Sequence, residues 1–228
     1  FAVVSRAPFE LAPFGGKAQS FRIMQCHLKQ FPLGNFSQTV VTAILEARTL
    51  VADRSDIAEV HIRVSPKAMN VMADSPEKWS PRNRETADHS IPYTAAVALM
   101  YGTVDQSYFD EKYFLHDQEL LGLVSRIKCT ALVETASSGP EISLWNLCEI
   151  DLVLRSGARK SVKAEYHRGH WRNPMSDFEI ETKFRSLAAG KLPAARVNAL
   201  LDRLWNLEGL AEIGTLIGMT EIPAELSS

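Results

Sequence analysis

The chain mixes two hydrophobic periods between residues 20 and 166, and this mixture limits the folds that it can adopt. Val60, Ile62 and Val64 alternate with charged neighbours, which is the period-two pattern of a strand with one buried face. Similar patterns predict three later strands, over Ile127–Val133, Glu149–Leu154 and Ser161–Tyr166. After about residue 173 only helical periods remain. We therefore predict an α+β fold: a small mixed domain followed by helices.

Helix patterns also lie between the predicted strands. Asn35 and Gln38 are spaced like a helix cap and its reciprocal partner, and the apolar positions behind them predict a helix to about Ala52. The run Thr86–Tyr101 predicts another helix, in which Pro92 either kinks the helix or delays its start. Before these helices, the alternation of Phe21, Ile23 and the residues up to Lys29 predicts a strand that ends near that lysine.

The C-terminal part reads as helical throughout. Ser176 and Glu179 have the spacing of a capping box for a helix that ends at Gly190. Pro193 opens a second helix, and a third is expected over about Leu210–Ile217. From these patterns we divide the chain into a linker or partner-dependent segment (1–18), an α+β domain (19–172) and terminal helices (173–228).

Composition excludes several classes of function. The 228 residues carry a net charge of −2, and their basic side chains are scattered, so we expect neither a nucleic-acid nor a membrane partner. No apolar run approaches the ~18 residues that a membrane span needs. Cys26, Cys129 and Cys148 lie far apart, which argues against a disulfide framework or a closed metal site. We therefore expect a cytoplasmic protein, and because the chain begins at Phe1, a piece of a longer one.

Three segments resemble proteins of the MmgE/PrpD family, which includes 2-methylcitrate dehydratase and cis-aconitate decarboxylase. They are HLKQFPLGNFSQTVVTAILEA (27–47), KWSPRNRETADHSIPYTAAVALMYG (78–102) and YHRGHWRNPMSDFEIETKF (166–184). Their order and spacing match the family, and the resemblance extends from about Ser20 to Leu207. The second segment is the most specific of the three.

The resemblance implies both an architecture and a chemistry. Members of the family combine a large all-helical domain with a smaller α+β lid domain, and the active site lies between the two. Residues 20–170 would then be the lid, and residues 176–220 would belong to a helical domain whose main body is absent from this sequence. The implied protein is a homodimeric lyase without metal or cofactor that acts on small di- and tricarboxylates, and this chain alone would be inactive.

The resemblance also points to four candidate site residues. Lys29 matches a lid lysine that points at the substrate; the alternative is an ordinary surface lysine. Tyr93 matches a tyrosine that lines the pocket, although core packing would explain it equally. Arg84 and His89 lie near the same helix start, where His89 can exchange a proton and would share a helical face with Tyr93. A hydrogen bond at the helix start is the alternative for His89 and its neighbour Asp88.

His167 and His170 flank a glycine turn but have no further metal ligands nearby in the sequence, so we expect no metal there. We expect this turn to join the lid to the terminal helices, with Arg172 paired to a carboxylate of the protein.

One departure from the family bears on the reaction. Some members carry a histidine in the turn after the lysine-aromatic-proline stretch, where this chain has Gly34 and Asn35. The following Ser37–Thr39 run looks like the 2-methylcitrate dehydratase branch, which favours dehydration. Decarboxylation, isomerisation and epimerisation within the same fold remain open, as does a non-catalytic lid, substrate-clamping or dimerisation module.

Overall fold

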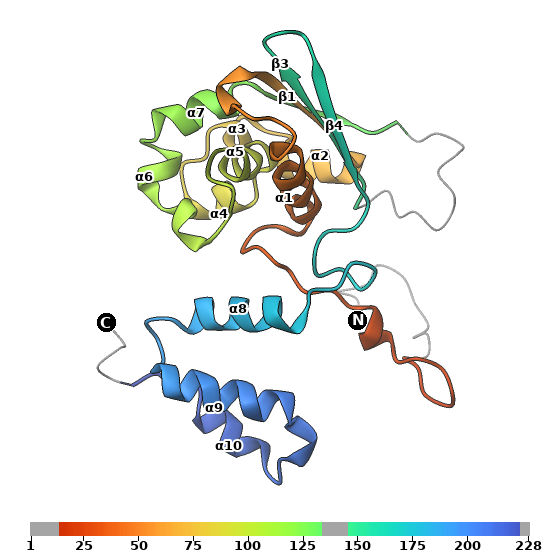
Figure 1. Ribbon diagram of the computed structural model, residues 1–228, viewed down its shortest axis with the longest axis vertical. Coiled ribbons are helices and arrows are strands. Elements are labelled where there is room, and N and C mark those ends of the chain that lie inside the picture. Colours follow the sequence, from red (N-terminus) through yellow and green to blue (C-terminus); the bar gives the residue numbers. More distant parts are fainter. Residues whose placement is uncertain (1–13, 134–145, 224–228) are drawn as a thin grey trace, which may run out of the picture. The chain divides into compact units, whose positions relative to one another are not determined.

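A computed structural model describes residues 14–133 and 146–223, so the first thirteen residues of the predicted linker lie outside it. The chain divides after Pro174 into two compact units, and each is described by itself (Figure 1). The first unit contains a four-stranded sheet and most of the helices. The second unit is helical. The fold class is thus α+β, as predicted.

The sheet of the first unit has the order β2-β1-β3-β4. Its strands are β1 (Ile57–Val64), β2 (Ile127–Ala131), β3 (Cys148–Leu154) and β4 (Arg159–Ala164). Strands β1 and β2 are parallel, and the other two pairings are antiparallel. The alternation in β1 is confirmed, because Val60, Ile62 and Val64 are buried while the residues between them are partly exposed.

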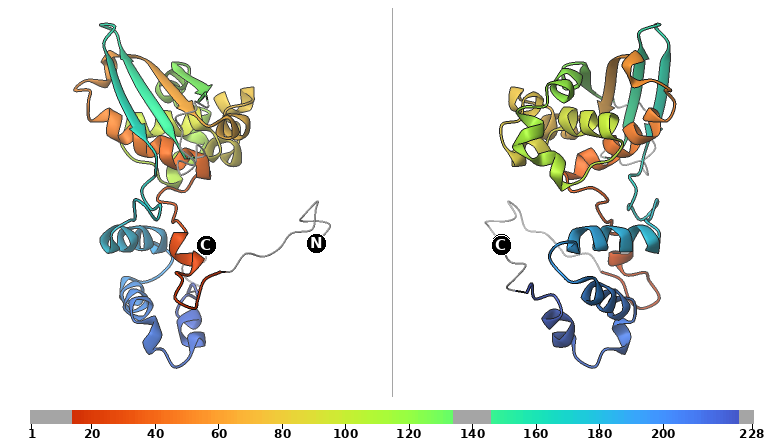
Figure 2. Two further views of the ribbon diagram at one scale, coloured as in Figure 1. Left: turned by 90° about the vertical axis from the view of Figure 1, so that its right-hand side faces the viewer. Right: turned by 60° about the vertical axis from the view of Figure 1, so that its left-hand side comes forward.

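Helices cover one face of this sheet (Figure 2). The first unit contains α1 (Asn35–Arg48), α2 (Pro66–Met72), α3 (Pro76–Trp79), α4 (Arg84–Asp88), α5 (Ile91–Tyr101), α6 (Glu111–Phe114) and α7 (Gln118–Val124). Helix α1 packs against β3 and β4, and α5 packs against α1, α7 and β2. The opposite face carries charged side chains, among them Arg63, whose guanidinium lies 2.9 Å from both Glu149 and Asp151. The sheet therefore has one apolar and one charged face, as its period-two pattern requires.

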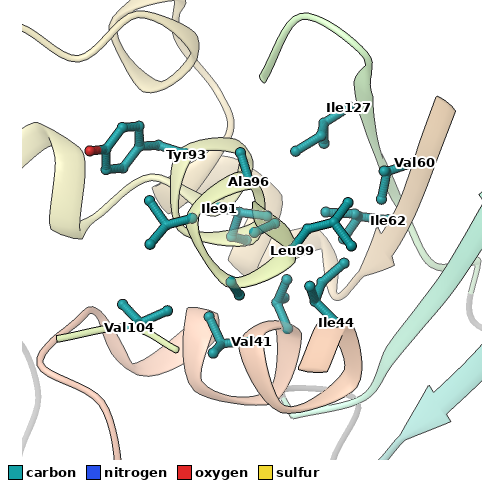
Figure 3. Packing of buried hydrophobic residues seen from close by; sticks show 14 of the residues in the cluster. Val41, Ile44, Val60, Ile62, Ile91, Tyr93, Ala96, Leu99, Val104 and Ile127 are labelled. Carbon is teal, nitrogen blue, oxygen red and sulfur yellow. The ribbon is translucent and has the colours of Figure 1, made fainter. Parts of the chain in front are cut away.

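Helix α5 occupies the centre of the core (Figure 3). Nine of its eleven residues are buried, so it is apolar on every side rather than amphipathic. Ser90 caps its start by accepting a hydrogen bond from the Tyr93 amide, and Pro92 stands within the first turn, where no amide hydrogen is needed. Pro92 thus delays the start of a helix, and the single helix predicted over Thr86–Tyr101 is in fact α4 followed by α5.

The predicted pairing of Asn35 with Gln38 as a helix cap is wrong. The residue that caps α1 is Gly34, with no side-chain hydrogen bond, and the helix ends at Arg48 rather than near Ala52. Gln38 is fully buried instead. Its amide nitrogen donates to the carbonyls of Phe31 and Leu33 at 2.9 and 3.2 Å, and its oxygen accepts from the Phe31 amide at 3.2 Å. This side chain satisfies the backbone of the turn that precedes the helix.

The strand predicted to end near Lys29 is also wrong. A short 3₁₀ helix, η1 (Arg22–Gln25), lies there, and Phe21, Ile23 and Leu28 are exposed. Alternating apolar residues form a strand only beside a partner strand, and none of the described strands pairs with this segment. The Leu28 amide of this segment donates to the Gly169 carbonyl at 2.9 Å.

The second unit contains α8 (Asp177–Ala188), α9 (Ala194–Trp205) and α10 (Ile213–Gly218). The predicted capping box of Ser176 and Glu179 is confirmed in both directions. Helix α9 buries Val197, Leu200 and Leu201 along one side. Among the helices of residues 14–133 and 146–223, none is both long and apolar enough to cross a bilayer.

Candidate active site

The segment that carries Lys29 leads into a rigid turn. Lys29 itself is exposed, whereas Phe31, Leu33 and Gly34 are buried. The buried Gln38 amide holds both ends of this turn through the three hydrogen bonds described above. An exposed ammonium group two residues before a fixed turn can meet an anionic ligand while its backbone is restrained.

His89 lies at the C-terminal end of α4, half-exposed and surrounded by oxygen atoms. Its Nδ1 atom lies 2.5 Å from the Asp88 carboxylate and 3.2 Å from the Glu85 carbonyl. A Glu85 carboxylate oxygen is 3.5 Å from the same nitrogen. The other end of α4 is capped by Asn83, whose side chain accepts from the Thr86 amide, and Arg84 follows as an exposed residue of the first turn.

The turn and α4 are in direct contact. The Gly34 amide donates to the Asp88 carbonyl at 3.0 Å. A Cβ atom added to Gly34 would lie 3.1 Å from Cδ2 of His89 and 2.5 Å from the Met72 methyl carbon. The absence of a side chain at this position therefore allows the turn to approach the imidazole. The structure brings the segment after Lys29 together with His89.

Tyr93 does not share a face with His89, and that prediction is wrong. The two residues lie on either side of the break between α4 and α5, because Ser90 caps a new helix there. The Tyr93 side chain is fully buried, and its hydroxyl donates to the Tyr108 carbonyl at 2.5 Å. Burial raises the pKa of Tyr93 well above its usual range. Core packing, the alternative considered for this residue, describes its position in the structure.

Three imidazoles gather at a second place, although the sequence pointed only to two. The His27 ring centroid lies 5.0 Å from that of His167 and 5.4 Å from that of His170. Sequence alone could not find His27, because its place depends on the contact between Leu28 and Gly169 across the unit. Burial lowers the pKa of His167, and burial together with the neighbouring cations lowers the pKa of His170 to about 4.

Two features of this histidine cluster (His27, His167 and His170) were not predicted from the sequence: the partner of the adjacent Arg172 and the surroundings of His167. Arg172 was expected to pair with a carboxylate, but its guanidinium donates to the Tyr166 hydroxyl at 2.8 Å and lies over the Trp171 ring; no carboxylate partner occurs among the described residues. The Nε2 atom of His167 is buried and has no hydrogen-bond partner among residues 14–133 and 146–223.

Within residues 14–133 and 146–223, one group of side chains has three possible metal-ligand atoms within 4.8 Å of one another, and it consists of Glu85, Asp88 and His89. These are the same acidic side chains that lie around the His89 ring. The Glu85 side chain among them is strongly exposed. Exposed acidic groups of this kind are common without a metal ion, so the group by itself identifies no metal centre.

Comparison with known proteins agrees with the fold and the motifs. Residues 31–207 match the model of the MmgE/PrpD C-terminal domain. The chain is 28% identical over 198 residues to cis-aconitate decarboxylase of Homo sapiens, which covers 86% of this chain and 40% of that protein. It is 25% identical over 144 residues to cis-aconitate decarboxylase of Mus musculus, covering 63% and 28%. The chain thus spans less than half the length of these curated relatives. Because the match extends over most of its residues, the chain belongs to the MmgE/PrpD family and contains the C-terminal domain of that family.

Proposed function

We propose that this chain contributes one wall of the active site of a lyase that acts on small di- or tricarboxylates without a metal or cofactor. The observation that carries the proposal is the contact between the turn after Lys29 and the imidazole of His89. The proposal is supported because a cation and a proton acceptor on neighbouring segments are what a reaction next to a carboxylate requires. Membership of the family and the similarity to cis-aconitate decarboxylase support the same class of enzyme.

Three of the four candidate residues have a distinct role in this proposal. The Lys29 ammonium pairs with a substrate carboxylate, and Arg84 contributes a second cation. His89 removes the proton from the carbon next to a carboxylate. The electron pair left behind forms the new double bond as hydroxide departs, and an acid protonates that hydroxide to water. Tyr93 has no contact with substrate in the proposal, because its hydroxyl is already bonded inside the core.

Dehydration is our first candidate reaction, and Gly34 is the reason. Some family members have a histidine in this turn, but here a Cβ atom at residue 34 would lie 2.5 Å from the Met72 methyl carbon and 3.1 Å from Cδ2 of His89, so a side chain there would displace these neighbours. Decarboxylation is the second candidate, favoured because both relatives are cis-aconitate decarboxylases. Isomerisation or epimerisation would begin with the same proton abstraction and differ in product.

The chain can also act only as a substrate-clamping or dimerisation module within a larger assembly, since it spans less than half the length of its relatives. A homodimer is part of the same proposal. In each of these proposals the Lys29 side chain contacts an anionic ligand. Ligand binding by the chain can therefore be tested even if the chain has no catalytic activity.

The test is differential scanning fluorimetry of the chain with citrate, 2-methylcitrate and cis-aconitate. A ligand at ~100 times its dissociation constant stabilises a fold by about 2.7 kcal/mol, which raises the melting temperature measurably. We expect Lys29→Ala to abolish this rise and Lys160→Ala, an exposed lysine on β4, to retain it. If no acid raises the melting temperature, or if Lys29→Ala leaves the rise unchanged, the proposed anion site on this chain is wrong.

The reaction class is then read from the products formed by a full-length enzyme. Water elimination gives an unsaturated acid with all its carbons, decarboxylation releases carbon dioxide, and epimerisation changes only the stereochemistry.

A further inference from the structure

The protonation of His89 can be deduced from the atoms around its ring. Its Nδ1 atom faces a carboxylate oxygen of Asp88 at 2.5 Å, the carbonyl of Glu85 at 3.2 Å and a carboxylate oxygen of Glu85 at 3.5 Å. Ionised carboxylates and carbonyls only accept hydrogen bonds. A nitrogen surrounded by acceptors must carry the proton, so the neutral ring has its hydrogen on Nδ1 and its lone pair on Nε2.

The ring edge that bears the lone pair lies beside the turn that follows Lys29. Cδ2 is bonded to Nε2, and it lies 3.1 Å from the place that a Cβ atom of Gly34 would occupy. The His89 side chain as a whole is 41% exposed, so part of the ring is open to solvent. The lone pair on Nε2 is one bond away from Cδ2, the ring atom that meets the turn.

Of the two acidic neighbours, Asp88 is the one that can fix the ring. Its side chain is 19% exposed, against 84% for that of Glu85, and its oxygen is about 1 Å closer to Nδ1. The backbone of Asp88 is also held, because its carbonyl accepts the hydrogen bond from the Gly34 amide at 3.0 Å. The Glu85 side chain is longer and more exposed than that of Asp88, so fixing it against the ring would cost more conformational entropy.

We infer that Asp88 is a positioning residue, which holds His89 with its proton on Nδ1 and leaves Nε2 as the base that faces the turn after Lys29. The catalytic meaning of this inference rests on the proposed function. In that reaction Nε2 takes the proton from the substrate carbon, the C–H bond breaks, and its electron pair stays on the substrate. The imidazolium that forms is stabilised by the Asp88 carboxylate, as in other histidine–carboxylate pairs.

The experiment is ¹⁵N NMR of the imidazole side chains in the 228-residue chain, treated with EDTA and kept at about pH 8.5, where unperturbed histidine is neutral. We expect the Nε2 signal of His89 in the unprotonated range and the Nδ1 signal in the protonated range. Asp88→Asn should move the proton toward Nε2, because a carboxamide can donate to Nδ1. Glu85→Gln is the matched control and should leave the tautomer unchanged, while Asp88→Glu should restore it.

A wild-type His89 with its proton on Nε2 would overturn the inference. An unchanged tautomer in a folded Asp88→Asn variant, judged by its dispersed amide spectrum, would overturn it too. If Asp88→Asn does not fold, Asp88→Glu and the wild type still decide the question, because both must show the proton on Nδ1. None of these results depends on ligand binding, so a failure of the proposed function in the melting experiment stays distinct from a failure here.

Discussion

At the scale of single residues, Gly34 has the tightest steric requirement in the site. Its φ of −55° is ordinary for any residue, so the requirement comes from space and not from backbone strain. A Cβ atom would meet the buried methyl group of Met72 and the ring of His89. The spacing of motifs identified the turn as important, but only the packed structure shows which neighbours exclude a side chain.

We expect Gly34→Ala to lower the free energy of unfolding by about 1 kcal/mol, because an extra methyl group in a filled space displaces its neighbours. Gly122→Ala is the control. Gly122 lies in α7 with nothing within 4 Å of an added Cβ atom, and alanine there should stabilise the helix by roughly 0.5–1 kcal/mol. Urea unfolding of both variants measures the difference, and equal stabilities would show that the turn has room to spare.

At the scale of elements, the sequence predicted best where a pattern depends on neighbours close in the chain. The capping box of α8 and the alternation in β1 are local, and both are confirmed. The strand expected before Lys29 fails because a strand needs a partner that local sequence does not reveal. The Ser90 cap divides the single helix predicted over Thr86–Tyr101 into α4 and α5, and this break separates His89 from Tyr93.

Gln38 connects two elements, the turn and α1, and its removal should show how much that connection contributes. Gln38→Leu keeps the approximate volume but leaves the Phe31 amide and the Leu33 carbonyl without their partner, while the Phe31 carbonyl keeps the hydrogen bond from the Leu33 amide. Buried groups left unpaired cost about 1–3 kcal/mol, so we expect a loss of that size in urea unfolding. Gln118→Leu, at an exposed position of α7, should change stability by less than about 0.5 kcal/mol. A tolerated Gln38→Leu would mean that the turn is held by other contacts.

At the scale of the molecule, the histidine cluster joins segments from the two ends of the first unit. His27 precedes all the strands, and His167 and His170 follow them. Burial lowers the pKa of His170 most, and the charged or titratable neighbours that lower it further are His167, His27 and the Arg172 guanidinium. The sequence motif identified the glycine turn between His167 and His170. Its contact with His27 joins residues that are far apart in the chain, so no local pattern could have predicted that contact.

This cluster should make the first unit sensitive to mild acid. The pKa of His170 is about 4 in the folded protein and near 6.5 when unfolded, so between these values the unfolded chain binds more protons. Stability is therefore greatest above about pH 6.5 and falls as the pH drops toward 4. We expect the melting temperature to decrease by several degrees from pH 7 to pH 5.

His170→Asn, which keeps an acceptor for the Arg172 amide, should reduce the decrease in melting temperature, while His116→Gln at an exposed position should not. An equally steep pH dependence in His170→Asn would assign the effect to other groups.

The sheet order has a consequence for the time course of synthesis. Ile57 of β1 pairs with Leu154 of β3, which is 154 − 57 = 97 residues later, and all the helices from α2 to α7 lie between them. Strand pairings across such intervals form slowly, because the entropy of closing a long loop is lost before any contact between the strands stabilises the pairing. While the ribosome is still producing those helices, β1 has neither of its neighbours, and its apolar side is exposed. The nascent chain therefore passes through an interval in which chaperones matter most; β2 is the first partner of β1 to emerge, and β1 gains its second only when β3 follows.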